Sequence, residues 1–274
     1  MEKIFTAKDG AQIYYEDTGS GQPLFLIHGW TCSSRFWRNN APELSKDFRV
    51  ITMDLRGHGN SSKILTGHTI PQYAQDIRAL IEHLGLDKVI LSGWSLAGPV
   101  VLSYWQQFSA DSRLKGMGLI DFNPCPFSQE DWNCHALKET TFDGMNRLHT
   151  LHATDIKGFA NDFAGKFSDT KAADGEHQWM VAELLKTPAW IAAAIYSDYL
   201  LRDYTTVLPT ITIPVIVVAA NSEIYKNGIQ QGKYIADQIP NSKFASFNTG
   251  GHIMFYEQPE KFNRILKDFI HQIN

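Results

Sequence analysis

One short segment limits the folds open to this chain of 274 residues. Residues 92–98, SGWSLAG, follow the apolar run 89–91 and precede the helical pattern 100–108. A strand that turns into a helix within so few residues needs small side chains at the turn, because the two backbones pass close together. The segment therefore predicts an α/β fold in which the Ser95 hydroxyl projects from a sharp turn.

Short apolar runs alternate with amphipathic helical patterns on both sides of this turn. Apolar runs of four to seven residues suit strands of a parallel sheet that is buried on both faces. The pattern predicts an α/β fold with a mostly parallel sheet of about eight strands, flanked by helices. The expected strands include 24–27, 49–53, 88–91, 117–120, 214–219 and 243–247, with a hairpin over 4–16 and helices over 70–84 and 258–273.

The alternation stops after Pro124. Residues 125–210 show no β pattern and are rich in phenylalanine, tyrosine and tryptophan. We expect them to form a helical lid, or cap, inserted into a core made of residues 1–124 and 211–274. In an open α/β sheet such a connection passes over the carboxyl ends of the strands, where ligands bind.

The serine turn resembles the nucleophile elbow of the α/β-hydrolase superfamily, and the resemblance covers nearly the whole chain outside the lid. It implies that Ser95 is the catalytic nucleophile. The usual Gly-x-Ser-x-Gly pattern is altered here, because Ala97 occupies the last position and Gly98 follows one place later. Alanine is small enough for the turn to form, with slight crowding.

The resemblance also implies an oxyanion hole. The strand over 24–27 ends in His28-Gly29-Trp30, and the family takes one donor from the backbone N–H after His-Gly, here that of Trp30. The second donor is the N–H of Leu96, after the nucleophile. Gly29 lets the backbone approach the substrate closely, while the His28 side chain is expected to bond backbone groups.

The general base that the resemblance implies is His252, which follows two glycines after the last expected strand. Two carboxylates are candidates for the acid that pairs with His252. Glu223 occupies the position of the family's Gly-x-x-Asp turn, so we predict that Glu223 is the acid of the triad. Asp121, at the end of the strand over 117–120, is the alternative acid, since some members place theirs there.

The expected reaction is hydrolysis of a carboxylic ester or lactone that has an apolar acyl part. Trp94 and Gly29, next to the reactive centre in sequence, are expected to line the substrate pocket. The Gly-Trp-Ser-Leu run, a glutamate acid and the spacing to His252 give a weaker resemblance to acyl-homoserine-lactone lactonases of the superfamily.

Two other functions remain open. The first is a cofactor-free dioxygenase of the same fold, in which His252 would deprotonate a hydroxy-quinolone-type heterocycle with Asp121 as its partner. Such enzymes often carry histidine before the serine, where this chain has Trp94. The second is a non-catalytic ligand receptor, because some receptors of this fold keep the triad.

Composition excludes several other classes of protein. The net charge is −4 and no basic block is present, so we expect no nucleic-acid partner. No apolar run is long enough to span a membrane. His149 and His152 lack the His-Glu-x-x-His pattern, so we expect no metal, and no cofactor is implied. The three cysteines lack a C-x-x-C pair and the start has no signal-peptide core, which predicts a cytoplasmic protein. We expect a monomer or a homodimer acting on a small molecule.

Overall fold

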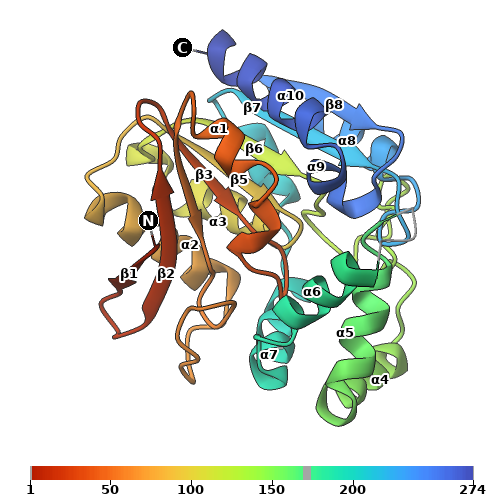
Figure 1. Cartoon of the computed structure of the whole chain (residues 1–274). Helices are drawn as coiled ribbons and strands as arrows, with labels where there is room; N and C mark the ends of the chain where they lie inside the picture. Colours follow the sequence, from red (N-terminus) through yellow and green to blue (C-terminus); the bar gives the residue numbers. More distant parts are fainter. Residues whose placement is uncertain (1, 169–173, 274) are drawn as a thin grey trace.

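The apolar runs form one sheet of eight strands (Figure 1), which confirms the predicted fold class. The computed structural model describes residues 2–168 and 174–273. The strands are β1 (Glu2–Thr6), β2 (Gln12–Thr18), β3 (Pro23–Ile27), β4 (Arg49–Met53), β5 (Val89–Trp94), β6 (Leu114–Ile120), β7 (Val215–Ala220) and β8 (Ser242–Phe247). Their order across the sheet is β1-β2-β4-β3-β5-β6-β7-β8. β2 pairs antiparallel with β1 and β4, and the remaining neighbours are parallel.

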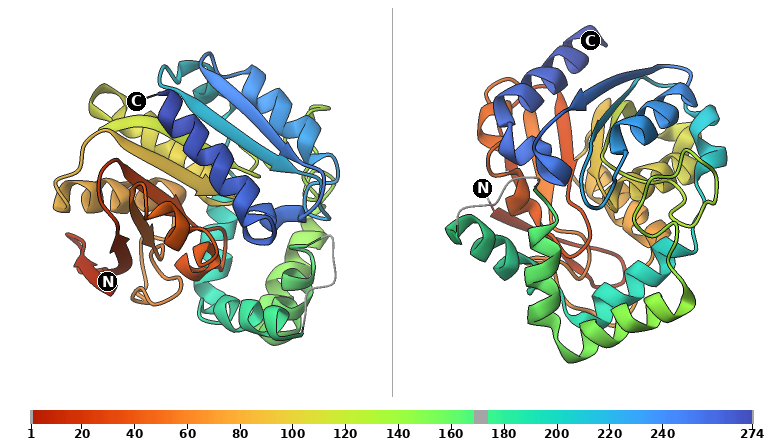
Figure 2. Two further views of the ribbon diagram at one scale, coloured as in Figure 1. Left: turned by 45° about the horizontal axis from the view of Figure 1, so that its top comes forward. Right: turned by 90° about the vertical axis from the view of Figure 1, so that its right-hand side faces the viewer.

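The sheet is buried on both faces, as its continuous apolar strands require. Along β3, Leu24 and Leu26 belong to one core cluster, while Phe25 and Ile27 belong to the other. This alternation is the period of two that a strand imposes. Helices cover both faces (Figure 2). One face carries α2 (Ile70–His83), α3 (Ala97–Phe108) and α8 (Gly228–Asp237), and the other carries α1 (Ala41–Leu44), α9 (Met254–Glu257) and α10 (Pro259–Gln272).

The helix α2 shows how local sequence sets these boundaries. The Thr69 hydroxyl accepts a hydrogen bond from the N–H of Gln72 and caps the start. The helix ends one residue before the predicted Leu84, and Gly85 follows with a φ of +62°. A left-handed residue at this place is the usual way to end a helix, and glycine adopts it without strain.

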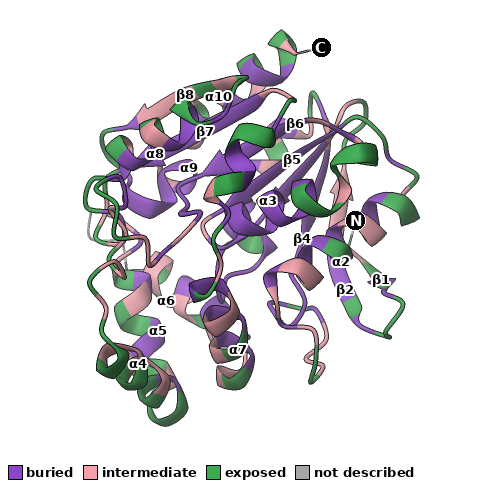
Figure 3. Ribbon diagram, turned by 180° about the vertical axis from the view of Figure 1, so that it is seen from behind, coloured by how far each residue is buried: buried purple, intermediate pink, exposed green. Residues whose placement is uncertain are grey.

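Among the described residues, four α-helices are inserted between β6 and β7 at one end of the sheet. They are α4 (Phe142–Thr154), α5 (Ile156–Gly165), α6 (Asp174–Leu184) and α7 (Ala189–Leu200). They lie together below the core in Figure 1, and Figure 3 shows that α4 is mostly exposed. The helical insertion is thus confirmed, whereas the boundaries at 125 and 210 remain a prediction. Residues 169–173 of the predicted lid lie outside the described residues.

Candidate active site

Ser95 stands at a strained turn between β5 and α3. Its φ is +57°, a left-handed conformation that a residue with a Cβ rarely adopts. The turn is held by two backbone hydrogen bonds, from the N–H of Ser95 to the oxygen of Ile120 at 2.9 Å and from the N–H of Gly98 to the oxygen of Ser95 at 2.9 Å. The Ser95 side chain lines a cavity beneath the lid.

Glycines on both sides of Ser95 are required by close neighbours. A Cβ at Gly93 would lie 2.4 Å from the carbonyl oxygen of Ala97, and a Cβ at Gly98 would lie 2.4 Å from the ring of Phe122. Both distances are far below van der Waals contact. The second glycine of the motif, displaced to Gly98, is therefore needed because the ring of Phe122 packs directly against it.

His252 is held by Asp121. The distance from the His252 Nδ1 to the Asp121 Oδ2 is 2.6 Å, and both side chains are 1% exposed. The other Asp121 oxygen accepts the N–H of Ala220 at 3.0 Å. Burial raises the pKa of the Asp121 carboxyl, and the hydrogen bond from His252 opposes that rise. Asp121 follows β6, which neighbours the Ser95 strand, so the two side chains leave adjacent strand ends.

Glu223 makes no hydrogen bond with His252 within the described residues, so the structure gives no support to the prediction that Glu223 orients the imidazole. The turn after β7 is closed by bonds from Ser222 N–H to the Tyr225 oxygen and from Tyr225 N–H to the Ser222 hydroxyl. That turn leaves Glu223 exposed at the rim of the cavity, whereas the alternative acid, Asp121, is buried against the imidazole.

The residues predicted to form the oxyanion hole, Trp30 and Leu96, lie beside the cavity. Both residues line the cavity together with Ser95. Neither backbone N–H donates to another group in the part of the chain that the structure describes. A Cβ at Gly29 would lie 3.0 Å from the Ser95 Cβ, so the glycine permits the close approach of this loop. Two free N–H groups beside a serine hydroxyl can stabilise an oxyanion.

The His28 side chain is fixed in one tautomer by backbone groups, as predicted for it. Its Nε2 accepts the N–H of Leu55 at 2.9 Å, so the hydrogen on Nδ1 is donated to the Gly29 oxygen at 2.7 Å. Burial lowers the pKa of His28 and favours this neutral form. His28 thereby ties the loop after β3 to the loop after β4.

Trp94 and Gly29, which were predicted to line the substrate pocket, are not among the residues that line this cavity. Trp94 is fully buried behind His252, with ring centroids 5.1 Å apart, and its Nε1 donates to the His252 oxygen at 2.9 Å. Gly29 lies behind Ser95, and neither residue borders the cavity. Trp94 supports the histidine loop instead.

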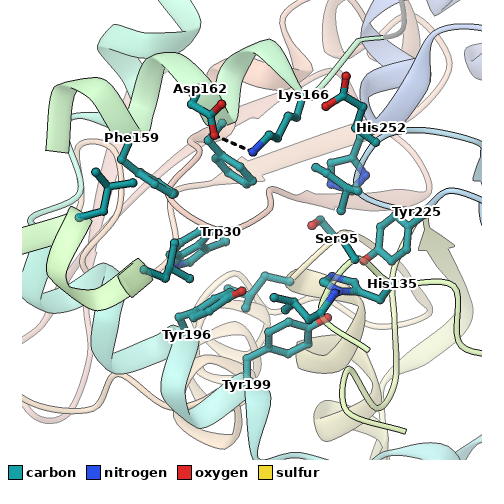
Figure 4. Close-up of a pocket in the computed structure, with 18 residues that line it drawn as sticks. Trp30, Ser95, His135, Phe159, Asp162, Lys166, Tyr196, Tyr199, Tyr225 and His252 are labelled. Carbon is teal, nitrogen blue, oxygen red and sulfur yellow. Dashed lines mark hydrogen bonds and ion pairs between the residues drawn. The ribbon is translucent and has the colours of Figure 1, made fainter. Parts of the chain in front are cut away.

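The cavity has a volume of about 270 Å³ and two unlike walls (Figure 4). An apolar wall comes from Trp30 and the lid helices α4 and α5, and a polar wall faces it beside His252. The sequence does not predict the polar wall, because the residues that form it belong to no recognisable motif. The apolar wall is Trp30, Leu148, Leu151, Phe159 and Phe163, and the polar wall is His135, Tyr199 and Tyr225.

No group of three or more histidine, cysteine, aspartate or glutamate side chains within residues 2–168 and 174–273 could hold a metal ion. His152 instead packs on Phe159 and Trp30, with ring centroids 4.0 and 5.1 Å apart. Across the same residues, no helix has both the length and the apolar character needed to cross a bilayer.

Comparisons with known proteins agree with this fold. A family model described as alpha/beta hydrolase fold matches residues 22–259. The chain is 29% identical over 277 residues to a protein named bifunctional esterase/perhydrolase DCH from Acinetobacter calcoaceticus, with 97% of this chain and 98% of that protein covered. It is 27% identical to the AB hydrolase superfamily protein YisY of Bacillus subtilis, with 98% and 99% covered. A solved esterase from Exiguobacterium antarcticum superimposes with a TM-score of 0.90 at 25% identity, covering 99% of this chain and 100% of that one.

Proposed function

This chain belongs to the α/β-hydrolase fold family, and from that premise we propose that it is a serine hydrolase that cleaves carboxylic esters with an apolar acyl part. The observation that carries the proposal is the 2.6 Å hydrogen bond between His252 and Asp121, beside a cavity that Ser95 also lines. A serine, a histidine and a buried carboxylate in this relation form the machinery of acyl transfer. The triad proposed is therefore Ser95, His252 and Asp121.

The reaction would proceed through an acyl-enzyme. The Ser95 Oγ attacks the ester carbonyl carbon while His252 Nε2 takes the hydroxyl proton, and Asp121 stabilises the imidazolium through Nδ1. The carbonyl oxygen becomes an oxyanion between the N–H groups of Trp30 and Leu96. Collapse breaks the bond to the alcohol oxygen, which receives the proton from His252. Water then attacks the acyl-enzyme in the same way and releases the acid and Ser95.

The residues that line the cavity support the proposal that the acyl part of the substrate is apolar. The rings of Phe159 and Phe163 pack around Trp30 at centroid distances of 5.6 and 5.3 Å, and Leu148 and Leu151 extend the surface. Burying each methylene there contributes about 0.8 kcal/mol. The name of the esterase/perhydrolase relative also supports an ester bond as the target. Lactones contain the same bond within a ring, and acyl-homoserine lactones combine it with an apolar chain.

A chain-length series of p-nitrophenyl esters from acetate to decanoate tests the proposal. We expect kcat/KM to rise over several carbons and then fall, because the cavity is apolar and bounded at about 270 Å³. Ser95→Ala should lower kcat by at least about 10⁴-fold for every ester of the series. Ser109→Ala, an exposed serine just after α3, is the matched control and should match the wild type. Activity highest on acetate would contradict the apolar acyl pocket, and turnover by Ser95→Ala would contradict the mechanism.

One observation also favours a second candidate, a cofactor-free dioxygenase. Its base would be a histidine paired with an aspartate in the position of Asp121, and that pair is present. Trp94 stands before the serine where those enzymes often have histidine. The Ser95→Ala variant separates the two, because oxygenation by a His252 base would survive the loss of the hydroxyl. Consumption of O₂ with a hydroxy-quinolone by this variant, without ester turnover by the wild type, would favour the dioxygenase.

A further inference from the structure

The polar wall of the cavity brings together residues distant in the chain. His135 belongs to the segment between β6 and the lid helices, Tyr199 lies in α7, and Tyr225 follows β7. An isolated antiparallel bridge joins the backbones of His135 and Tyr225, and their ring centroids are 4.9 Å apart. The wall is thus built by tertiary contacts from both lid and core, and the proposed function does not yet use it.

The position of the His135 proton follows from its hydrogen bond. The Nδ1 of His135 accepts the backbone N–H of Leu137 at 2.9 Å, so Nδ1 carries no hydrogen and Nε2 carries it. Burial, with a further contribution from the nearby His252, lowers the pKa of His135 to about 3. The ring is therefore neutral near pH 7. Its Nε2–H finds no hydrogen-bond acceptor among the described residues, although the side chain lines the cavity.

The two tyrosines complete a neutral set of donors. Burial raises the pKa of the Tyr199 hydroxyl and of the Tyr225 hydroxyl. Neither tyrosine nor His135 thus carries charge near pH 7, while the exposed Glu223 sits at the rim of the same cavity. The polar wall itself offers no countercharge to an anion, and Lys166, which also lines the cavity, is already ion-paired with Asp162 at 2.6 Å. The wall suits an uncharged oxygen that accepts hydrogen bonds.

The wall lies on the side from which the alcohol would depart. The ring of Tyr225 is 5.5 Å from that of His252, and Figure 4 shows His252, Tyr225 and His135 together, opposite Trp30 and Phe159. Because His252 has to deliver its proton to the leaving oxygen, the alcohol part lies on the His252 side. The acyl part then faces the apolar wall.

We propose that His135 is a specificity-determining residue, whose Nε2–H binds an uncharged ether or carbonyl oxygen in the alcohol part of the ester. This inference rests on the proposed function. It narrows the substrate class to esters or lactones that join an apolar acyl group to an alcohol with a second, neutral oxygen. An alcohol part made only of hydrocarbon would displace water from the His135 Nε2–H and leave that donor without an acceptor. An ester of such an alcohol should therefore bind less tightly.

The test compares two esters of equal size, 2-methoxyethyl butanoate and n-butyl butanoate, which differ by one oxygen in place of one methylene. Acid release measures kcat/KM for both, and the ratio is the readout because it is independent of the fraction of folded enzyme. For the wild type we expect a ratio of roughly threefold to tenfold in favour of the ether ester, the value of one neutral hydrogen bond. His135→Phe should bring the ratio to one or below, and His135→Gln, which keeps an N–H donor, should retain part of it.

The control is His149→Phe, which changes another lid histidine that does not line the cavity. It should keep the wild-type ratio. A wild-type ratio of one, or a ratio unchanged in His135→Phe, would overturn the assignment of His135 while both esters are still cleaved. No cleavage of either ester, together with no turnover of p-nitrophenyl esters, would instead overturn the proposed function.

Discussion

Three residues beside the cavity share an unusual backbone conformation. Thr31, Ser95 and Asp121 follow β3, β5 and β6, neighbouring strands of the sheet, and their φ values are +57°, +57° and +42°. Such conformations cost on the order of 1–3 kcal/mol each for residues with a Cβ. At Ser95 and Asp121 the sharp turn redirects a side chain toward the site. The strain at these two residues thus serves the proposed chemistry, whereas Lys88 and Arg113, which precede β5 and β6, have positive φ values away from the site.

The identity of the acid is tested by two isosteric amide substitutions. Asp121→Asn should reduce kcat for p-nitrophenyl butanoate by about 10³–10⁴-fold, because the amide stabilises the wrong tautomer of His252. Glu223→Gln should change kcat by less than about threefold, since an exposed rim carboxylate makes little difference. A severe loss in Glu223→Gln with Asp121→Asn fully active would return the acid role to Glu223.

The sequence predicts Ser95 and His252 but not the choice between the two acids. Asp121 comes directly after one apolar strand and Glu223 three residues after another, and Glu223 occupies the place that the family pattern favours. What separates them is burial and direction, set by the tight turn through Ser222 and Tyr225 and by the bond from Ala220 to Asp121. The bond between Ala220 and Asp121 joins residues 99 positions apart, which local patterns do not reveal.

The lid helices differ in how firmly the core holds them. In α6, the buried Glu183 accepts hydrogen bonds from Ser33 and Arg35 at 2.7 Å each. In α7, the Ala192 oxygen accepts the Trp30 Nε1–H at 3.0 Å, and Tyr196 stacks on Trp30 at 4.4 Å. By contrast, α4 buries only His152 among its residues. Polar contacts thus hold α6 and α7, whereas α4 packs on α5 and α7 through the buried His152 and the partly buried Met145 and Leu148.

His152 makes the attachment of α4 sensitive to acid. Neither ring nitrogen has a hydrogen-bond partner in the described structure, and burial lowers the pKa of His152 to about 4. The unfolded chain, with a histidine pKa near 6.5, binds more protons between pH 4 and 6.5. The free energy of unfolding therefore falls as the pH drops through this window.

His152→Met should reduce that acid sensitivity, because methionine fills the apolar site without titrating. Urea unfolding at several pH values would give the free energy of unfolding of each protein as a function of pH. The slopes of these two curves should differ by at most about 1.4 kcal/mol per pH unit. His149→Met on the same helix is the control. Identical pH profiles for the wild type and His152→Met would show that the imidazole does not contribute.

At the scale of the whole molecule, the sequence predicts the architecture well. Apolar runs such as 24–27 become strands buried on both faces, and the break in alternation after Pro124 marks the helical insertion. The lining of the cavity is a different matter. Trp94 lies next to Ser95 in sequence yet points behind His252, while His135 is 40 residues away and reaches the cavity. Such positions depend on the packing of the lid on the core.

The central claim, that Ser95 is a nucleophile activated by His252 and Asp121, is tested most directly by covalent labelling. The wild-type protein would be treated with a fluorophosphonate, digested and analysed by mass spectrometry while residual esterase activity is followed. The account predicts one adduct, on the peptide that contains Ser95, with activity lost in proportion to occupancy and with slow labelling in Asp121→Asn. Full esterase activity with Ser95 unmodified, or loss of activity that follows an adduct elsewhere, would contradict it.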